Sequence, residues 1–174
     1  DPIRMLPIDD IRRRLHHIHE RGIRDVRVLD RTFNYHAKRA IELLLLFAEF
    51  HPGMRFHLEI HPALLPQSVR EVLKSMPHGL LHPEAGIQSL RQEVLDGSLR
   101  KGTLEQSLDG LRYLCSLQNL VTHADLIAGL PRYTLAQIYE DIHTLAEYRA
   151  GEIQLESLKL LPGTLMRRDA VTLG

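Results

Sequence analysis

The chain has 174 residues, of which 44% are hydrophobic, and its 22 basic side chains balance its 22 acidic ones. This length suits one domain, spanning residues 1–174, and the balanced charge gives no reason to expect nucleic acid or an anionic membrane as a partner. A single cysteine excludes an internal disulfide framework and a multi-cysteine metal site within this chain. The apolar runs are too short to cross a bilayer and the start has no signal-peptide pattern, so we expect a cytoplasmic protein.

Helical and extended patterns alternate along the chain. Helices are predicted over residues 9–21, 37–50, 66–76 and 90–95, from 103 onward, and over 134–148. Strands are predicted over residues 25–29, 55–61, 80–87, 121–127 and 152–160. Two helix starts carry the Thr-x-x-Gln capping pattern, at Thr103 and Thr134.

This alternation, with short loops, predicts parallel strands joined by right-handed crossovers. Five strands are too few to close a barrel, and the chain opens on a helix that should follow a strand. The expected fold is therefore α/β: a partial, open TIM-like barrel of parallel strands with outer helices, cut from something larger. An exposed sheet edge would favour a homodimer.

Polar side chains recur on one face of the predicted strands, because alternate residues of a strand share a face. The set is His57, Glu59 and His61 on the second strand, His82, Glu84, Gly86 and Gln88 on the third, and His123 and Asp125 on the fourth. Any one of them can be part of a satisfied polar network. Their recurrence at the same level on successive strands favours a site at the barrel rim.

Two chemistries could use this face. In the first, histidines and carboxylates bind zinc or iron, as in a metal-dependent barrel hydrolase. Its ligands would be His57, Glu59, His61, His123 and Asp125. In the second, a small polar cofactor is bound by Glu59, Gln88 and Asp125 through its sugar hydroxyls, while Arg100 pairs with a carboxylate.

Three runs, Phe56–Ile60, Gly86–Ser89 and Asp125–Pro131, resemble the core of radical S-adenosylmethionine enzymes. The most similar branches are the oxygen-independent coproporphyrinogen III oxidases and the cobalamin-binding radical enzymes, including anaerobic magnesium-protoporphyrin monomethyl ester cyclases. The run Asp30–Asn34 is similar to the second-strand loop of the cobalamin-type members. The likeness extends over nearly the whole chain.

The resemblance implies a barrel that holds a [4Fe-4S] cluster and S-adenosylmethionine at its open end. Glu59, Gln88 and Asp125 would contact the ribose and the amino-acid part of the cofactor, and Arg100 would pair with its carboxylate. The Arg31–Thr32 backbone would receive the methionine amino group, and the backbone near Lys159 would contact the adenine. The cofactor would be cleaved reductively to start radical chemistry on a small-molecule substrate, with a tetrapyrrole as one candidate. An electron donor such as flavodoxin or ferredoxin and, in the parent protein, cobalamin are further expectations.

One departure from the family is large. Its members hold the cluster with three cysteines, whereas this chain has only Cys115, which lies in an amphipathic helix where a small buried side chain fits. We therefore expect the cluster ligands to lie outside this chain, and the fragment itself to be inactive. The metal-dependent hydrolase and a non-catalytic binding or scaffold module remain the alternatives.

Overall fold

The computed structural model of the protein describes residues 5–30, 32–97 and 102–173, and its centre is one five-stranded sheet. The strands are β1 (Asp25–Val28), β2 (Arg55–Ile60), β3 (Leu81–Gln88), β4 (His123–Ala128) and β5 (Glu152–Ser157). The helices are α1 (Ile8–Glu20), α2 (Ala37–Ala48), α3 (Gln67–Ser75), α4 (Gln92–Gly97), α5 (Leu104–Ser116), α6 (Leu135–Glu147), α7 (Leu165–Arg168) and α8 (Ala170–Leu173). A short 3₁₀ turn, η1, spans Pro62–Leu64.

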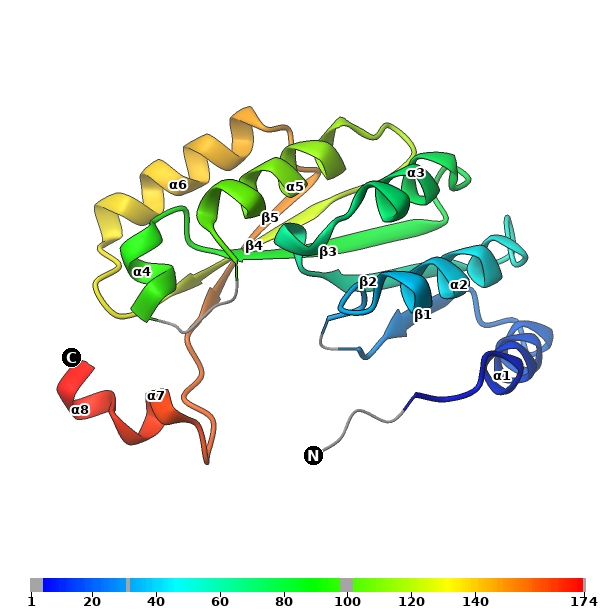
Figure 1. Cartoon of the computed structure of the whole chain (residues 1–174), viewed down its shortest axis with the longest axis horizontal. Coiled ribbons are helices and arrows are strands. Elements are labelled where there is room, and N and C mark those ends of the chain that lie inside the picture. The colour runs from blue at the N-terminus through cyan, green and yellow to red at the C-terminus, as the bar shows by residue number, and fades with distance from the viewer. Residues whose placement is uncertain (1–4, 31, 98–101, 174) are drawn as a thin grey trace.

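The strands are all parallel and lie in chain order, β1-β2-β3-β4-β5. Figure 1 shows α2, α3, α5 and α6 covering one face of the curved sheet, which we call the outer face. The opposite, inner face is left partly open. This arrangement confirms the predicted fold, an open part of a parallel barrel with outer helices. All carboxyl ends of the strands therefore meet at the same edge of the sheet.

The core lies between the outer face and the helices. Alternate residues of the central strands point there and are almost completely buried: Phe56, Leu58, Leu81, Ala85, Ile87, Ala124 and Leu126. Phe56 stacks on Phe47 of α2, with ring centroids 4.1 Å apart and ring planes 10° apart. Burying one such large apolar side chain stabilises the fold by about 1.5–3 kcal/mol. The apolar residues of β2, β3 and β4 therefore supply the sheet's share of the buried core.

The two predicted capping boxes are both present. Thr103 accepts a hydrogen bond from the backbone N–H of Gln106, whose side chain accepts one from the N–H of Thr103; Thr134 and Gln137 repeat the arrangement. Each box satisfies two of the backbone N–H groups left open at a helix start. α5 lies very close to η1, because a Cβ on Gly110 would be 2.0 Å from the carbonyl oxygen of Pro62.

Most element boundaries were predicted to within three residues, and the main differences lie in the last two strands. β4 begins at His123 rather than Val121, because its pairing with β5 begins at His123 opposite Glu152. β5 ends at Ser157 rather than at residue 160. Gly129 has a φ of +88° and turns the chain away from β4, so β5 loses its partner after Ala128.

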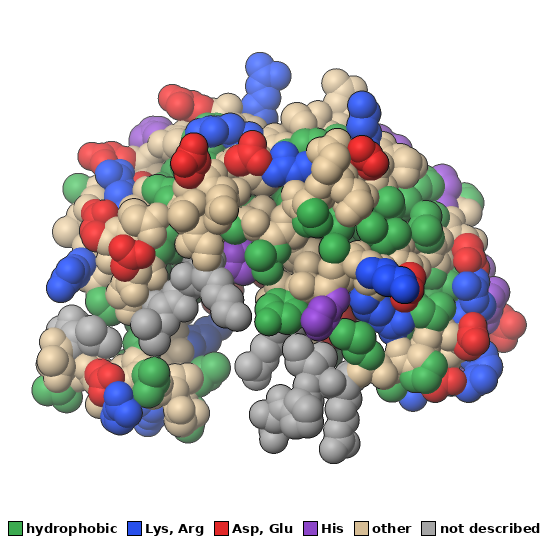
Figure 2. All heavy atoms as spheres, viewed as in Figure 1, with side chains coloured by type: hydrophobic (Ala, Val, Ile, Leu, Met, Phe, Trp, Pro, Cys, Tyr) green, Lys and Arg blue, Asp and Glu red, His purple; other side chains and the backbone are tan. Residues whose placement is uncertain are grey.

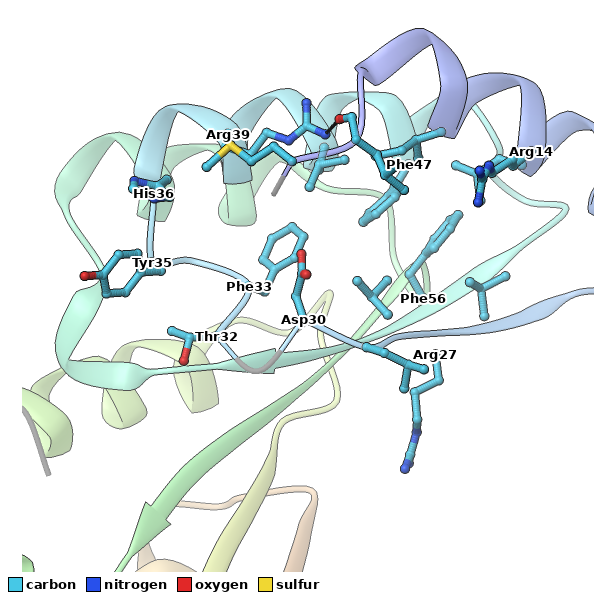
Figure 3. A pocket seen from close by; sticks show the side chains of 18 residues that line it. Arg14, Arg27, Asp30, Thr32, Phe33, Tyr35, His36, Arg39, Phe47 and Phe56 are labelled. Carbon is cyan, nitrogen blue, oxygen red and sulfur yellow. Dashed lines mark hydrogen bonds between the residues drawn. The ribbon is translucent and has the colours of Figure 1, made fainter. Parts of the chain in front are cut away.

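The β1 edge of the sheet borders an apolar groove. Among the described residues, β1 pairs with β2 alone, and a cavity of about 860 Å³ lies between β1, α1 and α2. Figure 3 shows Phe33, Phe47 and Phe56 along this cavity, while Arg27 points away from it. Leu29 directly after β1 is 84% exposed. These observations agree with the expected exposed edge of the sheet. Formation of a homodimer through this edge stays a prediction.

The surface agrees with the balanced composition. Figure 2 shows basic and acidic side chains interspersed over one side of the molecule rather than gathered by sign. Among the helices of the described ranges, none is both long and apolar enough to span a membrane.

Candidate functional site

A polar cleft lies on the inner face at the carboxyl ends of the strands. One cavity of about 180 Å³ is lined by Thr32, Glu59, Ile60, His61, Glu84, Gly86, Gln88 and Asp125. A second cavity of about 270 Å³ is lined by Gly86, Gln88, Asp125, Ile127, Glu156, Ser157, Leu158 and Lys159. The two cavities share three residues and therefore adjoin. Ligands of open parallel sheets bind at this edge, so it is the place to look for function.

The structure brings five of the seven predicted cofactor residues to this cleft. Thr32, Glu59, Gln88 and Asp125 line the first cavity, and Lys159 lines the second. The side chain of Lys159 is exposed and forms an ion pair with Glu156 at 3.0 Å. The predicted contact with the adenine involves the backbone near Lys159 and not this side chain. The remaining two, Arg31 and Arg100, lie outside the described residues, so their roles stay predictions.

Asn34 fixes the loop after β1 against the end of β2. Its side-chain amide is almost fully buried and donates to the carbonyl oxygens of His61 and Leu64, at 2.9 and 2.6 Å. Its side-chain oxygen accepts from the backbone N–H of His61 at 2.9 Å, and Phe33 N donates to the Glu59 carbonyl at 2.9 Å. These bonds hold the loop residue Thr32 beside Glu59.

Asp141 in α6 fixes the segment after β3. Its carboxylate is 1% exposed and accepts from Tyr133 Oη at 2.6 Å, Leu90 N at 2.8 Å and Arg91 Nε at 2.9 Å. Just before this segment Gln88 has a φ of 69°, a left-handed conformation that costs a non-glycine residue about 1–3 kcal/mol. The network around Asp141 therefore helps to hold a strained residue at the edge of the cleft.

Sequence reasoning missed Asp141 as a positioning residue, although a signal was present. Ile138, Asp141 and Leu145 follow the spacing of one helix face, and all three are buried. An acidic residue at such a position needs partners, which the structure supplies.

Asp125 and Glu84 are an unequal carboxyl pair. Burial, then the hydrogen bond to Glu84 and the negative charges of Glu84, Glu156 and Glu59, raises the pKa of Asp125 to about 8. Burial alone would raise the pKa of Glu84, but hydrogen bonds from His57 and Asp125 hold it below its ordinary value. At neutral pH, Asp125 is therefore mostly protonated and donates its one hydrogen bond to Glu84, which is ionised.

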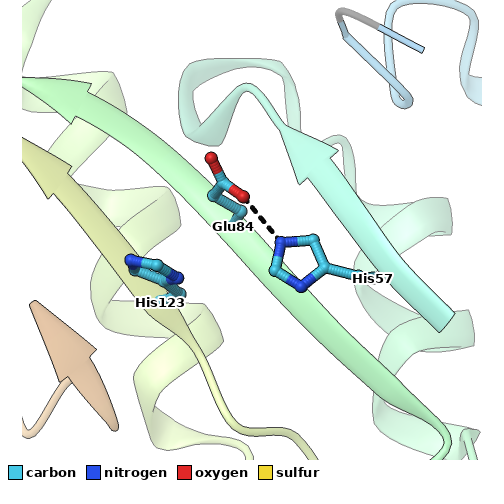
Figure 4. Close-up of side chains that lie close together, drawn as sticks. All are labelled: His57, Glu84 and His123. Atoms are coloured by element: carbon cyan, nitrogen blue, oxygen red, sulfur yellow. Dashed lines mark hydrogen bonds and ion pairs between the residues drawn. The ribbon is translucent and has the colours of Figure 1, made fainter. Parts of the chain in front are cut away.

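Three histidines on adjacent strands lie on the inner face, on the amino-terminal side of the cleft. His57 Nε2 is 2.6 Å from Glu84 Oε2, and the ring centroids of His57 and His82 are 4.8 Å apart. The ring of His123 lies 6.0 Å from that of His82 and 6.4 Å from that of His57. Figure 4 shows His57, Glu84 and His123 on three neighbouring strands, all on the same side of the sheet.

Of the five metal ligands predicted from the sequence, the structure places two, His57 and His123, in one group of neighbouring ligand atoms. Ligand atoms that lie within 4.8 Å of one another in the described chain form two groups: His57 with Glu84 and His123, and His82 with His123 and Glu152. Glu59, His61 and Asp125 belong to neither group. Glu59 pairs in register with Glu84 and both line the cleft, but it is the Glu84 carboxylate that approaches the His57 ring.

The single cysteine lies away from this site. Cys115 is half-buried in α5 and packs against the core, as predicted, and burial raises the pKa of its thiol to about 11. A thiol that stays protonated at neutral pH is a poor metal ligand.

Comparison with known proteins agrees with this geometry. The profile of the Radical SAM superfamily matches residues 1–145. No curated protein sequence matches the chain. The family match covers the first four strands and most of α6, and so includes most of the cleft described above.

Solved structures of low sequence identity share the fold. The radical S-adenosylmethionine methyltransferase TsrM from Kitasatospora setae, with cobalamin and a [4Fe-4S] cluster bound, gives a TM-score of 0.76 at 18% identity, over 92% of this chain and 30% of that one. SuiB from Streptococcus suis gives 0.75 at 16% identity, over 91% and 35%. Coproporphyrinogen III oxidase (HemN) from Escherichia coli, a radical SAM enzyme, gives 0.62 at 19% identity, over 89% and 37%.

The chain thus spans about a third of the length of the solved structures that it matches. With a superfamily profile over 145 of its 174 residues and the partial barrel that these structures share, the chain belongs to the radical SAM superfamily.

Proposed function

We propose that this chain is the S-adenosylmethionine-binding core of a radical SAM oxidoreductase. The observation that carries the proposal is the cleft at the carboxyl ends of the strands, where Thr32, Glu59, Gln88 and Asp125 converge in a chain of this superfamily. When bound, S-adenosylmethionine and a reduced [4Fe-4S] cluster supply one-electron cleavage of the sulfonium C–S bond, which starts radical chemistry on a substrate.

The residues of this chain bind and orient the cofactor. The carboxylate of Glu59 accepts hydrogen bonds, the amide of Gln88 both donates and accepts, and Asp125, whose proton is donated to Glu84, can accept. Together they suit the ribose hydroxyls and the amino and carboxylate groups of the methionine part. The left-handed backbone of Gln88 aims this residue at the cleft, and Asp141 helps to hold the segment that follows it.

The cluster does not fit the cysteine content of this chain. Such a cluster needs thiolates, and the one thiol available is kept protonated in α5, on the other side of the sheet from the cleft. We therefore propose that the cluster ligands come from outside these 174 residues. No chemical step of the cluster is assigned to a residue of this chain.

The substrate and the partners are proposed at a coarser level. TsrM binds cobalamin and a cluster, HemN is a coproporphyrinogen oxidase, and SuiB has been solved with a precursor peptide. These different ligands occur with one barrel, so the barrel alone does not select the substrate. A tetrapyrrole substrate, cobalamin and an electron donor such as flavodoxin or ferredoxin remain proposals for the whole protein.

The test is anaerobic reconstitution, with iron and sulfide, of the full polypeptide that contains this chain. After reduction it should release 5′-deoxyadenosine from S-adenosylmethionine. Gln88→Ala should lower the affinity for S-adenosylmethionine about tenfold, the effect of losing one or two hydrogen bonds. Gln118→Ala, the same change at an exposed position, should not. A full polypeptide that takes up a cluster yet releases no 5′-deoxyadenosine would contradict the proposal.

A further inference from the structure

The inner face carries a group of metal-ligating side chains, of which His57 and His123 do not line the S-adenosylmethionine cleft, while Glu84 lines one of its cavities. His57 comes from β2, Glu84 from β3 and His123 from β4, and their ligand atoms lie within 4.8 Å of one another. His57 and His123 precede the proposed cofactor contacts Glu59 and Asp125 by two residues on their strands, and Glu84 lies opposite Glu59. Their positions follow from the parallel register, in which His57 lies opposite His82 and Glu84 lies opposite His123.

One member of the group is buried without a matching hydrogen bond. His123 is 7% exposed, and its Nε2 makes no hydrogen bond to any part of the chain that the structure describes. The nearest acidic oxygen, Asp125 Oδ1, lies 3.1 Å away but also lacks a hydrogen bond within the described residues. An unpaired buried polar atom costs on the order of 1–3 kcal/mol, so a ligand that uses this nitrogen would recover that cost.

The chemistry of the group selects the ligand. Two imidazoles and one carboxylate on three rigid strands form a known donor set for zinc and for non-haem iron(II), with a further position open to water. The negative charge of Glu84, with Glu152 at 3.4 Å from His123 Nδ1, makes this part of the inner face attractive to a cation. Two cations, Arg27 and Arg55, line the neighbouring cavity; Arg27 lies opposite His57 in the sheet register, and Arg55 is engaged by Asp25 at 2.6 Å.

We propose that His57, Glu84 and His123 bind one divalent transition-metal ion, with zinc as the reference ion, on the inner face beside the cofactor cleft that Glu84 also lines. Zinc ligands lie about 2.0–2.1 Å from the ion, so neighbouring ligand atoms of a tetrahedral site are about 3.3 Å apart. Binding requires His57 Nε2 and Glu84 Oε2 to separate slightly from 2.6 Å and the His123 ring to approach them. Both adjustments are within side-chain rotation.

A second possible group shares His123 but is less suitable. It consists of His82, His123 and Glu152, and the Glu152 side chain is 55% exposed, compared with 20% for Glu84. An exposed carboxylate loses more side-chain freedom on binding and is better hydrated, so it is the weaker ligand. The two groups make different predictions for mutants.

The experiment measures zinc binding by the chain itself, freed of metal with a chelator and without a cluster, by competition with a chromophoric chelator. We expect one zinc per chain. His57→Gln, Glu84→Gln and His123→Gln should each weaken binding at least about tenfold. His143→Gln, the same change at an exposed histidine of α6, should leave binding unchanged. Circular dichroism checks that each variant is folded.

Cobalt(II) gives a second measurement that needs no variant. The wild-type chain should show visible absorption bands of a four- or five-coordinate site, and zinc should displace them. Zinc binding that is absent, or equally strong in the three variants, would overturn the proposal. So would loss of binding in His82→Gln and Glu152→Gln with retention in His57→Gln and Glu84→Gln. Because no cluster is involved, these results are independent of the proposed radical chemistry.

Discussion

The two faces of the same strands differ in what they contribute. In β2 the outer residues Phe56 and Leu58 are completely buried, while the residues that alternate with them, His57 and Glu59, line cavities on the inner face. The outer face has apolar packing and can be tested by stability. The inner face holds histidines, carboxyl groups and an amide, and its role can be tested by measuring the binding of ligands. The alternation of a strand thus allows stability and function to be encoded in one short segment.

The largest expected effect comes from the outer face. Phe56→Ala should lower the free energy of unfolding by about 3–5 kcal/mol, because it removes a ring stacked on Phe47 and leaves a cavity. The control is Arg55→Ala, the preceding residue on the opposite face, whose ion pair with Asp25 is largely exposed and worth at most about 1 kcal/mol. Chemical denaturation measures both. Equal losses would mean that the two faces do not differ in this way.

A smaller effect is expected at Asp141, the buried carboxylate of α6 that holds the segment after β3. Asp141→Asn should lower stability by about 1–3 kcal/mol, because Arg91 loses a buried charge partner and the other donors lose an acceptor. Glu140→Gln removes the exposed carboxylate that binds the same arginine, and should cost less than about 1 kcal/mol. Denaturation curves of the two variants give the comparison. A larger loss in Glu140→Gln would contradict the positioning role of Asp141.

The inner face should also be visible in the pH dependence of stability. With its pKa raised to about 8, Asp125 holds a proton in the folded state that the unfolded chain releases near pH 4. The folded state therefore binds more protons between these values, and this group makes stability fall as pH rises from about 4 to 8. The slope for one proton cannot exceed about 1.4 kcal/mol per pH unit.

Asp125→Asn should remove this contribution. The free energy of unfolding of the wild type and of the variant would be measured from about pH 5 to about pH 8 in steps of about one pH unit. The contribution of Asp125 would appear as a difference between the two slopes of stability against pH. Parallel curves for the two proteins would contradict the protonated state assigned to Asp125, and with it the hydrogen bond that it donates to Glu84.

The sequence predicted the fold better than the site. Period-two alternation and helix caps such as Thr103 are local signals, so strands and helix starts were placed closely. The proposed metal ligands depend on side-chain direction across strands, which register alone does not supply: Glu84 rather than Glu59 approaches His57. The left-handed φ of Gln88 and the hydrogen bonds of Asp141 depend on segments about fifty residues apart, and no local pattern encodes them.

The most direct test of the central claim is an NMR titration of the ¹⁵N-labelled chain with S-adenosylmethionine. The account predicts that amide shifts gather at the cleft, around Glu59, Gln88, Asp125 and Lys159. The apolar groove around Val28 and Phe47 provides the internal comparison and should change little. Shifts confined to that groove, or no shift at the cleft at saturating cofactor, would contradict the claim that the inner face at the carboxyl ends of the strands binds the cofactor.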